Sequence, residues 1–443
     1  MNIKDLNIKN QNATKKVAFL TLGCKVNSYE TNGMIQNFIS NGYEVVGFNS
    51  YADVYVINTC TVTNMSDRKS RKFIREPKRI NPRAIVVACG CYVQVAKEKL
   101  ENIEDIDLTI GNNEKKDIVQ IVENYMTTKN KLVDIDNVLY SDEYCEFGNV
   151  TYTEKTRAVI KIQDGCDRFC TYCIIPFARG KIRSRRPENI ISEIEKIAQN
   201  GIKEVVITGI HVASYGKDFK NNYGLIDILE EINKIKGIER IRLGSLEPLI
   251  IDEAFLKRLV KLEKVCHHFH LSLQSGCDET LKRMNRRYTT EEFLKVTKLL
   301  RENYLDVILT TDIIVGFPGE TNEEFERTRK FLEEVKFYKM HVFKYSQRNG
   351  TKAAVMPNQV SGEEKDKRSK ILLEMSDELE KEYLKQYIGK EIEVLFEEKI
   401  GEYVVGHTAN YLMSIYKTDE NIENKIVKLK VIDIKDLQLV CVT

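Results

Sequence analysis

Three closely spaced cysteines constrain this chain more than any other feature of its sequence. Cys166, Cys170 and Cys173 form a C-x₃-C-x₂-C pattern that directly follows the apolar, strand-like segment 158–162. Cysteine thiolates hold iron–sulfur clusters, and thiolates at this spacing can converge on one cluster. The usual cluster takes four ligands, whereas no fourth cysteine follows nearby. The pattern therefore predicts an iron that is open to a substrate.

A helix is the competing interpretation of the same spacing. Offsets of four and seven residues would place three small apolar side chains on one helix face. Gly165 stands directly before the pattern and Pro176 shortly after it, and both residue types disfavour a continuous helix. We therefore expect a cluster-binding loop in which the three cysteines carry the catalytic chemistry.

The loop and its flanks resemble the radical S-adenosylmethionine (SAM) superfamily, and within it the methylthiotransferases. The resemblance rests on Gly-Cys-Asp-Arg-Phe-Cys-Thr-Tyr-Cys-Ile-Ile-Pro at 165–176, on Ala-Arg-Gly at 178–180 and on Ser-Arg at 184–185. It implies that SAM fills the open iron site through the amino and carboxylate groups of its methionine. It further implies that an electron from the cluster cleaves SAM to methionine and a 5′-deoxyadenosyl radical, which takes hydrogen from an unactivated carbon.

The length and composition of the chain limit its architecture and partners. A chain of 443 residues predicts two to four domains. Its net charge of +2 gives no global attraction to a polyanion, so a nucleic-acid surface would have to be a local patch. The N-terminus lacks an apolar signal region and no long apolar run occurs, so we expect a cytoplasmic protein without membrane contact. The 11 cysteines are crowded into short motifs, which favours metal ligation over disulfides.

A second group of cysteines lies in the predicted N-terminal domain, residues 15–133. Buried strands alternate with helical segments there, which predicts an open parallel α/β sheet. Ligands of such sheets bind beyond the carboxyl ends of the strands, and Cys24, Cys60 and Cys91 all follow strand ends. They could thus meet as a second cluster site. Buried free cysteines that serve as small apolar residues are the alternative. The predicted strands are 17–22, 54–58 and 84–88.

The motifs around these cysteines resemble the methylthiotransferase N-terminal domain. Gly-Cys-Lys-Val-Asn, Asn-Thr-Cys-Thr-Val-Thr and Gly-Cys-Tyr-Val-Gln match the three motifs that ligate an auxiliary [4Fe–4S] cluster in that family. The resemblance therefore implies metal ligation by Cys24, Cys60 and Cys91. Cys89 lies in the third motif as well, but Cys91 directly precedes Tyr92 and so matches the family position. We take Cys89 as a bystander.

Two groups of basic residues are candidates for contacts with RNA. A helix predicted over about 63–79 is rich in lysine and arginine, and it is either a solvated face or a phosphate-contacting patch. A second group surrounds the cysteine loop and suggests an anionic macromolecular substrate. For Arg179 and Arg185, steric support of the open iron is the competing role. The second group consists of Arg168, Arg179, Lys181, Arg183, Arg185, Arg186, Lys282, Arg283, Arg286 and Arg287.

After an acidic, polar linker at 134–149, residues 150–383 predict an incomplete (β/α)₆ barrel. Six strands alternate with helical segments, and the cysteine loop follows the first strand. Sites in such barrels lie at the carboxyl ends of the strands. The whole segment resembles the radical SAM core. The predicted strands are 157–163, 204–209, 238–244, 267–273, 306–315 and 339–346.

Four other strand ends match the family's SAM contacts, with less force than the cysteines. The resemblance implies that Thr208 and Gly209 meet the methionine amino group and that Glu247 accepts from the ribose. An apolar turn beside adenine follows the fifth strand. Tight turns and helix caps are the alternatives for the glycine, proline and glutamate positions. The implied cofactor-binding residues are Thr208, Gly209, Glu247, Gln274, Gly316 and Pro318.

Several helix starts are also readable from the sequence. Ser28 is expected to cap the first helix of the N-terminal domain. Thr321 with Glu324, and Ser361 with Glu364, fit the capping-box pattern. Pro187 fits the first turn of the helix after the cysteine loop.

The C-terminal residues 384–443 predict a third module. Five short strands with alternating patterns indicate a small antiparallel β-barrel, a fold that binds oligonucleotides. The stretch Gly-His-Thr-Ala-Asn-Tyr at 406–411 resembles the TRAM domain of RNA-modifying enzymes. Between Tyr387 and Thr443 there are seven lysines against ten acidic residues, so any contact with RNA would depend on a few placed residues.

Together, a polar tail at 1–14 and three consecutive modules resemble a radical SAM methylthiotransferase over nearly the whole chain. The stretch Thr-Leu-Gly-Cys-Lys-Val-Asn-Ser-Tyr-Glu-Thr at 21–31 resembles the MtaB group of that family. This implies methylthiolation at C2 of N6-threonylcarbamoyladenosine at position 37 of tRNA, beside the anticodon. The implied cofactors are two [4Fe–4S] clusters and SAM. The implied partners are a tRNA anticodon stem-loop, an external electron donor and a sulfur source.

Other functions remain open at this point. Related methylthiotransferases act on isopentenyladenosine in tRNA or on an aspartate of a ribosomal protein. A non-catalytic electron-transfer protein would also need clusters, but it would not cleave SAM in stoichiometric amounts. A non-catalytic RNA-binding protein would need no cysteine triplets, and it would hold almost no iron or sulfide.

Overall fold

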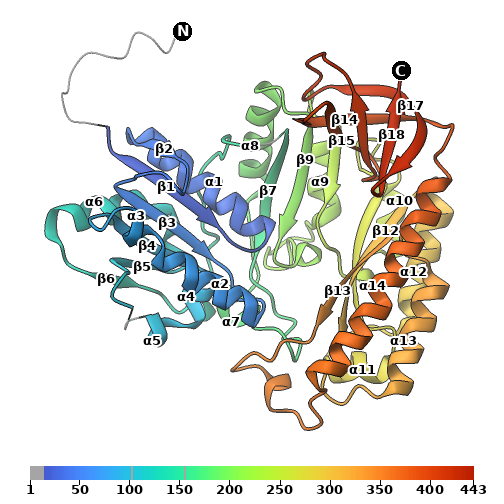
Figure 1. Cartoon of the computed structure of the whole chain (residues 1–443), viewed down its shortest axis with the longest axis horizontal. Helices are drawn as coiled ribbons and strands as arrows, with labels where there is room; N and C mark the ends of the chain where they lie inside the picture. The colour runs from blue at the N-terminus through green and yellow to red at the C-terminus, as the bar shows by residue number, and fades with distance from the viewer. Residues whose placement is uncertain (1–13, 101–102, 154–155) are drawn as a thin grey trace. The chain divides into compact units, whose positions relative to one another are not determined.

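A computed structural model describes residues 14–100, 103–153 and 156–443 of the chain. The chain divides into two compact units (Figure 1). The first holds the residues up to Cys60 together with Met65–Asp136, and the second holds Thr61–Asn64 and Asn137–Thr443. All but the last residue of the predicted polar tail lies outside the described residues. No helix in the described ranges is both long and apolar enough to cross a membrane.

The first unit is built on the parallel sheet that the sequence predicts. Its strand order is β2-β1-β3-β4-β5-β6, and all neighbouring pairs are parallel. Every residue of β3 and β4 is buried, as expected for central strands covered on both faces. The strands are β1 Lys16–Thr21, β2 Glu44–Val46, β3 Val54–Thr59, β4 Ile85–Gly90, β5 Leu108–Ile110 and β6 Leu132–Asp134.

Two details of the helices in this unit differ from the sequence-based prediction. Helix α1 (Lys25–Ser40) begins directly after Cys24, so the predicted cap at Ser28 is wrong. Gly23 adopts a φ of +103°, which lets the chain turn from β1 into the helix without a longer loop. The basic helix is interrupted after α2 (Asn64–Arg75), because Pro77 has no amide hydrogen and starts α3 (Pro77–Ile80) instead. The other helices are α4 Cys91–Val95, α5 Lys97–Leu100 and α6 Ile118–Thr128.

The second unit contains the predicted incomplete barrel. Six strands run parallel, in the two sheets β10-β9-β7 and β11-β12-β13, with the short β8 antiparallel to β7 at one edge. Two isolated parallel bridges, Ile241 to Val265 and Leu246 to Leu271, join the sheets. The strands are β7 Arg157–Asp164, β8 Arg183–Ser184, β9 Glu204–Gly209, β10 Arg240–Leu243, β11 His268–Gln274, β12 Ile308–Val315 and β13 Lys339–Lys344.

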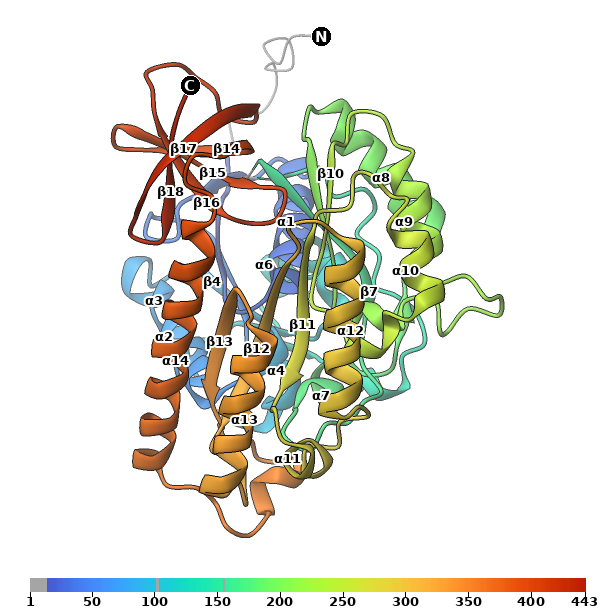
Figure 2. The same cartoon turned by 90° about the vertical axis from the view of Figure 1, so that its right-hand side faces the viewer.

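Helices cover the outside of these strands, and Figure 2 shows α12, α13 and α14 side by side over β11–β13. Thr321 and Glu324 form the predicted capping box, and Pro187 opens α8 as predicted. Ser361 accepts from the Glu364 amide, which is one half of the predicted box, and Thr289 caps α12 with a box that the prediction missed. The helices are α7 Ile175–Arg179, α8 Pro187–Gln199, α9 Leu225–Asn233, α10 Glu253–Leu259, α11 Asp278–Arg283, α12 Thr290–Asn303, α13 Asn322–Val335 and α14 Gly362–Lys385.

The C-terminal residues form a closed five-stranded barrel in the order β14-β15-β16-β18-β17. The predicted number of strands and the barrel are confirmed. Four of the pairings are antiparallel, whereas β16 and β18 are parallel, because the long β17 returns the chain so that β18 enters beside β16 in the same direction. The strands are β14 Glu391–Ile400, β15 Tyr403–Thr408, β16 Met413–Lys417, β17 Ile426–Lys435 and β18 Gln438–Val442.

The TRAM-like stretch 406–411 packs on the amino-terminal ends of strands from the six-stranded barrel. Buried Arg242 of β10 donates to the carbonyl oxygens of Thr408 and Ala409. The ring of Tyr411 stacks on His268 of β11 and on His407, with 4.8 Å between ring centres in each case. The TRAM-like stretch therefore attaches the C-terminal barrel to the strands β10 and β11.

Candidate functional site

The cysteine loop after β7 is fixed by backbone hydrogen bonds from three distant segments. The Cys166 amide donates to the carbonyl of Gly180 at 3.0 Å. Thr171 donates its amide to the Met284 carbonyl at 3.0 Å, and its carbonyl accepts from the Ala353 amide at 2.8 Å. Gly165 has a φ of +73°, and a Cβ there would lie 1.7 Å from the Lys181 carbonyl oxygen. The conformation of the loop is thus fixed by contacts within the protein.

The three thiols of this short loop interact electrostatically. Burial raises the pKa of Cys166 to about 11, and the neighbouring Cys170 adds to the effect. Burial likewise raises the pKa of Cys173 to about 12, again with contributions from the other two thiols. Such thiols lose their protons when they bind metal.

The donor set fits a multi-iron cluster. Within the described ranges, no three His, Cys, Asp or Glu side chains lie close enough to hold a single metal ion. The thiolates of an iron–sulfur cluster are spread over several metal atoms, so a wider spacing is what a cluster needs. The loop brings three thiols and a backbone fixed by hydrogen bonds to one strand end, and this donor set fits the cofactor that the sequence implies.

The six residues implied in SAM binding lie at the same edge of the barrel as the cysteine loop, because they end parallel strands or follow them. Thr208 and Gly209 end β9, and Gln274 ends β11 with a φ of +71°. Glu247 follows β10, and Gly316 and Pro318 follow β12. The topology therefore brings them together around Cys166, Cys170 and Cys173, and their contacts with SAM remain a prediction.

Glu247 is held by Arg168, which the sequence suggested only as an RNA contact, and by His211, which the sequence did not single out. Arg168 of the cysteine loop pairs with its carboxylate, and His211 Nε2 lies 3.3 Å from Oε2. Burial opposes ionisation of Glu247, but the hydrogen bond and charge of His211 and the charge of Arg168 hold its pKa at about 2. Glu247 precedes a short 3₁₀ turn without capping it through its side chain. It is therefore an ionised acceptor linked to the loop.

Gly209 and Gly316 stand where a side chain would collide with neighbouring groups. A Cβ at Gly209 would lie 2.9 Å from Gln163 Oε1, and one at Gly316 would lie 2.3 Å from Lys365 Cγ. The Gly316 amide donates to Glu320 at 2.6 Å, and Arg368 of α14 pairs with the same carboxylate at 2.6 Å. Arg368 of α14 therefore stabilises the turn after β12 through Glu320.

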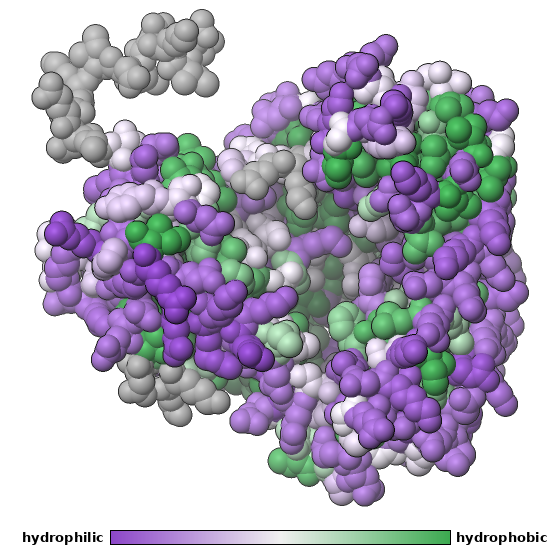
Figure 3. Space-filling view, in the orientation of Figure 1, coloured by the Kyte–Doolittle hydropathy of each residue, from purple (hydrophilic) through white to green (hydrophobic). Residues whose placement is uncertain are grey.

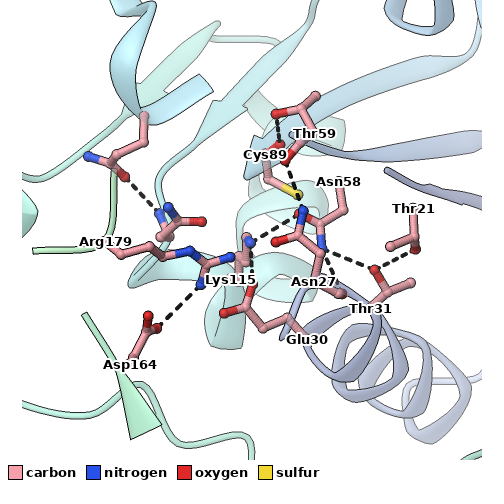
Figure 4. A network of polar contacts seen from close by, with 12 residues as sticks. Thr21, Asn27, Glu30, Thr31, Asn58, Thr59, Cys89, Lys115, Asp164 and Arg179 are labelled. Carbon is pink, nitrogen blue, oxygen red and sulfur yellow. Dashed lines mark hydrogen bonds and ion pairs between the residues drawn. The ribbon is translucent and has the colours of Figure 1, made fainter. Parts of the chain in front are cut away.

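Three arginines of the predicted basic group around the loop cannot form an RNA surface because they are buried, whereas Lys181, Arg186, Lys282 and Arg287 are exposed and stay a prediction. Arg179 and Arg183 are fully buried and lie near the Asp164 carboxylate, at 3.3 and 3.8 Å (Figure 4 draws the Arg179 pair). Arg185 is fully buried too and pairs with Glu146 and Glu193 at 2.6 and 3.1 Å. These guanidinium groups neutralise internal carboxylates. A count of basic residues in the sequence cannot distinguish such buried arginines from arginines at the surface.

A cavity of about 710 Å³ opens beside Arg168 and Glu247, between the segments that follow β9 and β10. The aromatic side chains of Tyr215, Phe219 and Tyr223 line it, together with apolar residues of α10 and the preceding turn. This space gives a substrate room next to the implied SAM contacts.

The three cysteines of the first unit follow the carboxyl ends of adjacent strands. The strands β1, β3 and β4 are neighbours, and Cys24, Cys60 and Cys91 come directly or shortly after them. A Cβ at Gly23 would lie 2.8 Å from Cys60 Sγ, so the segment that carries Cys24 packs on Cys60. Gly90, just before Cys91, packs against the Thr59 backbone in the same way. This arrangement supports a shared cluster site.

Polar side chains behind these cysteines fix the strand ends (Figure 4). Asn27 of α1 donates to the carbonyls of Leu22 and Thr59 at 2.7 and 2.9 Å. Asn58 donates to the Asn27 carbonyl and accepts from Lys115 at 3.1 Å. Lys115 also pairs with Glu30 at 2.5 Å, although both side chains are buried. Buried polar groups of this kind are stable only when paired, so they hold β1 and β3 in one register.

Cys89 and Cys91 can be distinguished by iron content. Cys89 lies inside the buried strand β4, whereas Cys91 starts α4 beyond the strand end. We therefore expect Cys91→Ser to lose the auxiliary cluster and Cys89→Ser to retain it, measured as iron and sulfide per chain after anaerobic reconstitution. A greater loss in the Cys89 variant would reverse the assignment.

Helix α2 presents a groove of cations on the first unit, which we call the α2 groove. It encloses about 300 Å³ and is lined by Arg68, Arg71, Lys72, Arg75, Glu76 and Arg79. In α2 only Ser70 and Ile74 are buried, so the helix exposes most of its surface. Figure 3 shows strongly hydrophilic side chains gathered over this part of the first unit.

Comparisons with known proteins agree with these modules. The family model of the radical SAM superfamily matches residues 160–332, and that of the uncharacterized protein family UPF0004 matches residues 16–111. The chain is 41% identical to the threonylcarbamoyladenosine tRNA methylthiotransferase MtaB of Bacillus subtilis (strain 168) over 422 residues, which covers 94% of this chain and 93% of that protein. It is 44% identical to the protein of the same name from Aquifex aeolicus, over 86% of this chain and 92% of that one.

Two further similarities are more distant. The tRNA-2-methylthio-N(6)-dimethylallyladenosine synthase of Caldicellulosiruptor saccharolyticus is 36% identical, over 95% of this chain and 90% of that protein. Among solved structures, the radical S-adenosylmethionine methyltransferase TsrM of Kitasatospora setae matches with a TM-score of 0.56 at 16% identity, over 74% of this chain and 73% of that one. The latter match supports the fold.

Proposed function

Because the chain belongs to the MtaB-type tRNA methylthiotransferases of the radical SAM superfamily, we propose that it methylthiolates C2 of N6-threonylcarbamoyladenosine in tRNA. Members of this family use SAM and [4Fe–4S] clusters, so this enzyme uses SAM and two such clusters. Bound SAM and its cluster supply the radical that removes hydrogen from the substrate carbon. The two MtaB relatives, which are named for threonylcarbamoyladenosine, are more similar to this chain than the synthase named for dimethylallyladenosine. This favours threonylcarbamoyladenosine as the substrate over isopentenyladenosine.

In this proposal the residues of the chain divide into two sets. Cys166, Cys170 and Cys173 hold the cluster that serves SAM, and Glu247 with the other strand-end residues orients SAM. Cys24, Cys60 and Cys91 hold the auxiliary cluster, at which the sulfur is supplied or carried. The presence of both cysteine sets at carboxyl ends of parallel strands, in one chain, is the observation that supports the proposal best.

Two further partners follow from the chemistry. Cleavage of SAM consumes an electron, and the inserted sulfur must be replaced, so an external electron donor and a sulfur source have to serve the enzyme. The methyl group comes from a second molecule of SAM. We place the enzyme in the cytoplasm, where tRNA is found.

Mass spectrometry of tRNA nucleosides tests this function directly. Cells with the gene should contain the methylthio derivative of threonylcarbamoyladenosine, and cells without it should contain only the unmodified threonylcarbamoyladenosine. Loss of the methylthio group from isopentenyladenosine instead would assign the enzyme to the other tRNA substrate. Unchanged tRNA in both strains would contradict the proposal.

The α2 groove is proposed to hold tRNA phosphates close to the auxiliary cysteines. Arg71 donates to the Tyr92 hydroxyl at 3.1 Å, and Tyr92 directly follows Cys91. Ser70, on the buried face of α2, donates to the Cys60 carbonyl at 3.0 Å. The helix that carries the exposed cations is therefore bonded to two of the cysteine segments. Single-stranded RNA needs such phosphate contacts while its bases are splayed out.

Removing charge from this groove should weaken tRNA binding in a salt-dependent way. For Arg71→Ala combined with Arg75→Ala, we expect the slope of log K against log salt to fall by about one for each lost phosphate contact. Iron content and SAM cleavage in the absence of tRNA should stay near those of the wild type. Binding titrations at several salt concentrations measure the slope.

Exposed lysines outside the groove provide the control. Lys116→Ala combined with Lys131→Ala removes the same formal charge from the same unit. We expect this control to change the slope little. If both double variants changed the slope equally, the effect would be general attraction and the groove would be only a solvated surface.

A further inference from the structure

The guanidinium of Arg286 lies against the sulfur of Cys170, although 116 residues separate them in the chain. Its Nη1 is 3.3 Å from Cys170 Sγ. Nη2 donates to the Ser272 carbonyl at 3.1 Å, and Nε donates to the Tyr288 hydroxyl at 3.0 Å. The orientation of the guanidinium is thus set by a backbone carbonyl and a tyrosine, independently of the sulfur.

Tyr288 is itself fixed, so it is a firm support for Arg286. Its hydroxyl donates to the Leu273 carbonyl at 2.7 Å, and only 4% of the residue is exposed. The guanidinium of Arg286 also lies 4.9 Å from the centre of the Tyr288 ring. A planar cation held on a ring face by hydrogen bonds has little freedom to turn away from the sulfur.

Arg286 differs from the other arginines around the cysteine loop in its charge balance. Arg168, Arg185 and Arg283 each pair with a carboxylate, namely that of Glu247, Glu146 or Glu324. Throughout the described part of the chain, no carboxylate forms an ion pair with Arg286. The Glu247 carboxylate interacts with its charge from beyond ion-pair distance, but that carboxylate is paired with Arg168. A partly buried charge without an ion pair is costly, so proteins seldom keep one unless something else balances it.

An anionic cluster is a suitable counterpart for this charge. Each cysteine ligand contributes a thiolate, and reduction adds one further negative charge. In a poorly solvated site, a fixed cation beside one of the ligands acts more strongly than it would in water. Reduction potentials of iron–sulfur clusters depend on net charge and on hydrogen bonds to the sulfurs.

We infer that Arg286 raises the reduction potential of the cluster on Cys166, Cys170 and Cys173 by donating to the Cys170 sulfur and by placing beside it a positive charge that no ion pair neutralises. The inference rests on the proposed function, because it requires a cluster at these cysteines. Reduction takes one electron from the external donor, and no bond forms or breaks. Arg286 is thus a positioning and tuning residue that makes this electron transfer easier.

The midpoint potential of the loop cluster in the reconstituted full chain tests the inference. It is measured in a redox titration in which electron paramagnetic resonance reports the reduced cluster. The titration is repeated in the Cys24→Ala/Cys60→Ala/Cys91→Ala background, so that the signal comes from the loop cluster. For Arg286→Gln we expect the reduced-to-oxidised ratio at a fixed potential to fall at least tenfold, which is about 59 mV for one electron. Arg286→Lys keeps a charge without the fork of donors and should give a smaller fall of the same sign.

Arg283→Gln is the matched control, because Arg283 lies three residues earlier and pairs with Glu324 instead of a cysteine. Its potential should equal that of the wild type. An unchanged potential in Arg286→Gln with full iron content would overturn the inference and leave the proposed function intact. If Arg286→Gln failed to hold iron, Arg286→Lys would decide: a lowered potential supports the inference and a wild-type potential overturns it. Absence of iron from the wild-type loop would refute the proposed function itself.

Discussion

The Cys170→Ala variant is expected to produce no detectable 5′-deoxyadenosine from SAM. Cys170 is the middle ligand of the proposed loop cluster, it is 8% exposed, and its neighbours on both sides are held by hydrogen bonds to distant segments. Its loss leaves two thiolates, too few to hold the cluster and to keep one iron open for SAM. Chromatography of the reaction with a chemical reductant measures the product.

The auxiliary cluster should survive this substitution, so iron per chain should fall by about half, as expected when one of two similar clusters is lost. Cys441→Ala is the control, because Cys441 is a buried cysteine in the core of the C-terminal barrel. It should cleave SAM like the wild type. A Cys170→Ala protein that still forms 5′-deoxyadenosine would contradict the assignment of the radical site to Cys166, Cys170 and Cys173.

The Cys60→Ala variant should show the opposite behaviour. We expect it to cleave SAM at a near wild-type rate and to form no methylthio product, because the cluster at Cys24, Cys60 and Cys91 supplies or carries the sulfur in the proposed function. Cys60 is 4% exposed and lies directly after β3, where a Cβ on Gly23 would touch its sulfur. Nucleoside analysis of a tRNA substrate, run in parallel with the SAM cleavage assay, separates the two activities.

The Cys89→Ser variant described above is the control for this second prediction, since it removes a cysteine from the same edge of the sheet. It should retain product formation. Normal methylthiolation by Cys60→Ala would remove the auxiliary cluster from the mechanism. Loss of SAM cleavage together with the product would instead show that the two sites are not independent.

Much of the architecture was predictable because it depends on local patterns. Buried strands that alternate with helices specify a parallel sheet, and parallel strands bring their carboxyl ends to one edge. Cys24, Cys60 and Cys91 could therefore be grouped before any contact was known. The cap at Ser28 failed for an equally local reason: Gly23 turns the chain so sharply that the helix begins four residues earlier than the serine suggests.

The environment of the charged residues was not predictable in the same way. Arg179 and Arg185 look in the sequence like the arginines of a nucleic-acid surface, yet both are fully buried and paired with carboxylates. A sequence records that a residue is basic but not whether a carboxylate from another segment reaches it. The basic residues of α2 look the same in the sequence as the buried arginines around the cysteine loop. Only the structure shows that they lie at the surface, because Ser70 and Ile74 are the only buried residues of that helix.

The chemistry could be predicted from short motifs. The spacing of Cys166, Cys170 and Cys173, and the resemblance of the segments around Cys24, Cys60 and Cys91, both indicate cluster ligation, because thiolates are the usual ligands of iron–sulfur clusters. The surroundings of these cysteines could not be predicted, because they depend on how distant segments pack. Arg286 reaches Cys170 across 116 residues, and Arg168 reaches Glu247 across 79. Such contacts depend on how the strand ends pack, since a hydrogen bond or an ion pair is fixed by distance in space and not by separation along the chain.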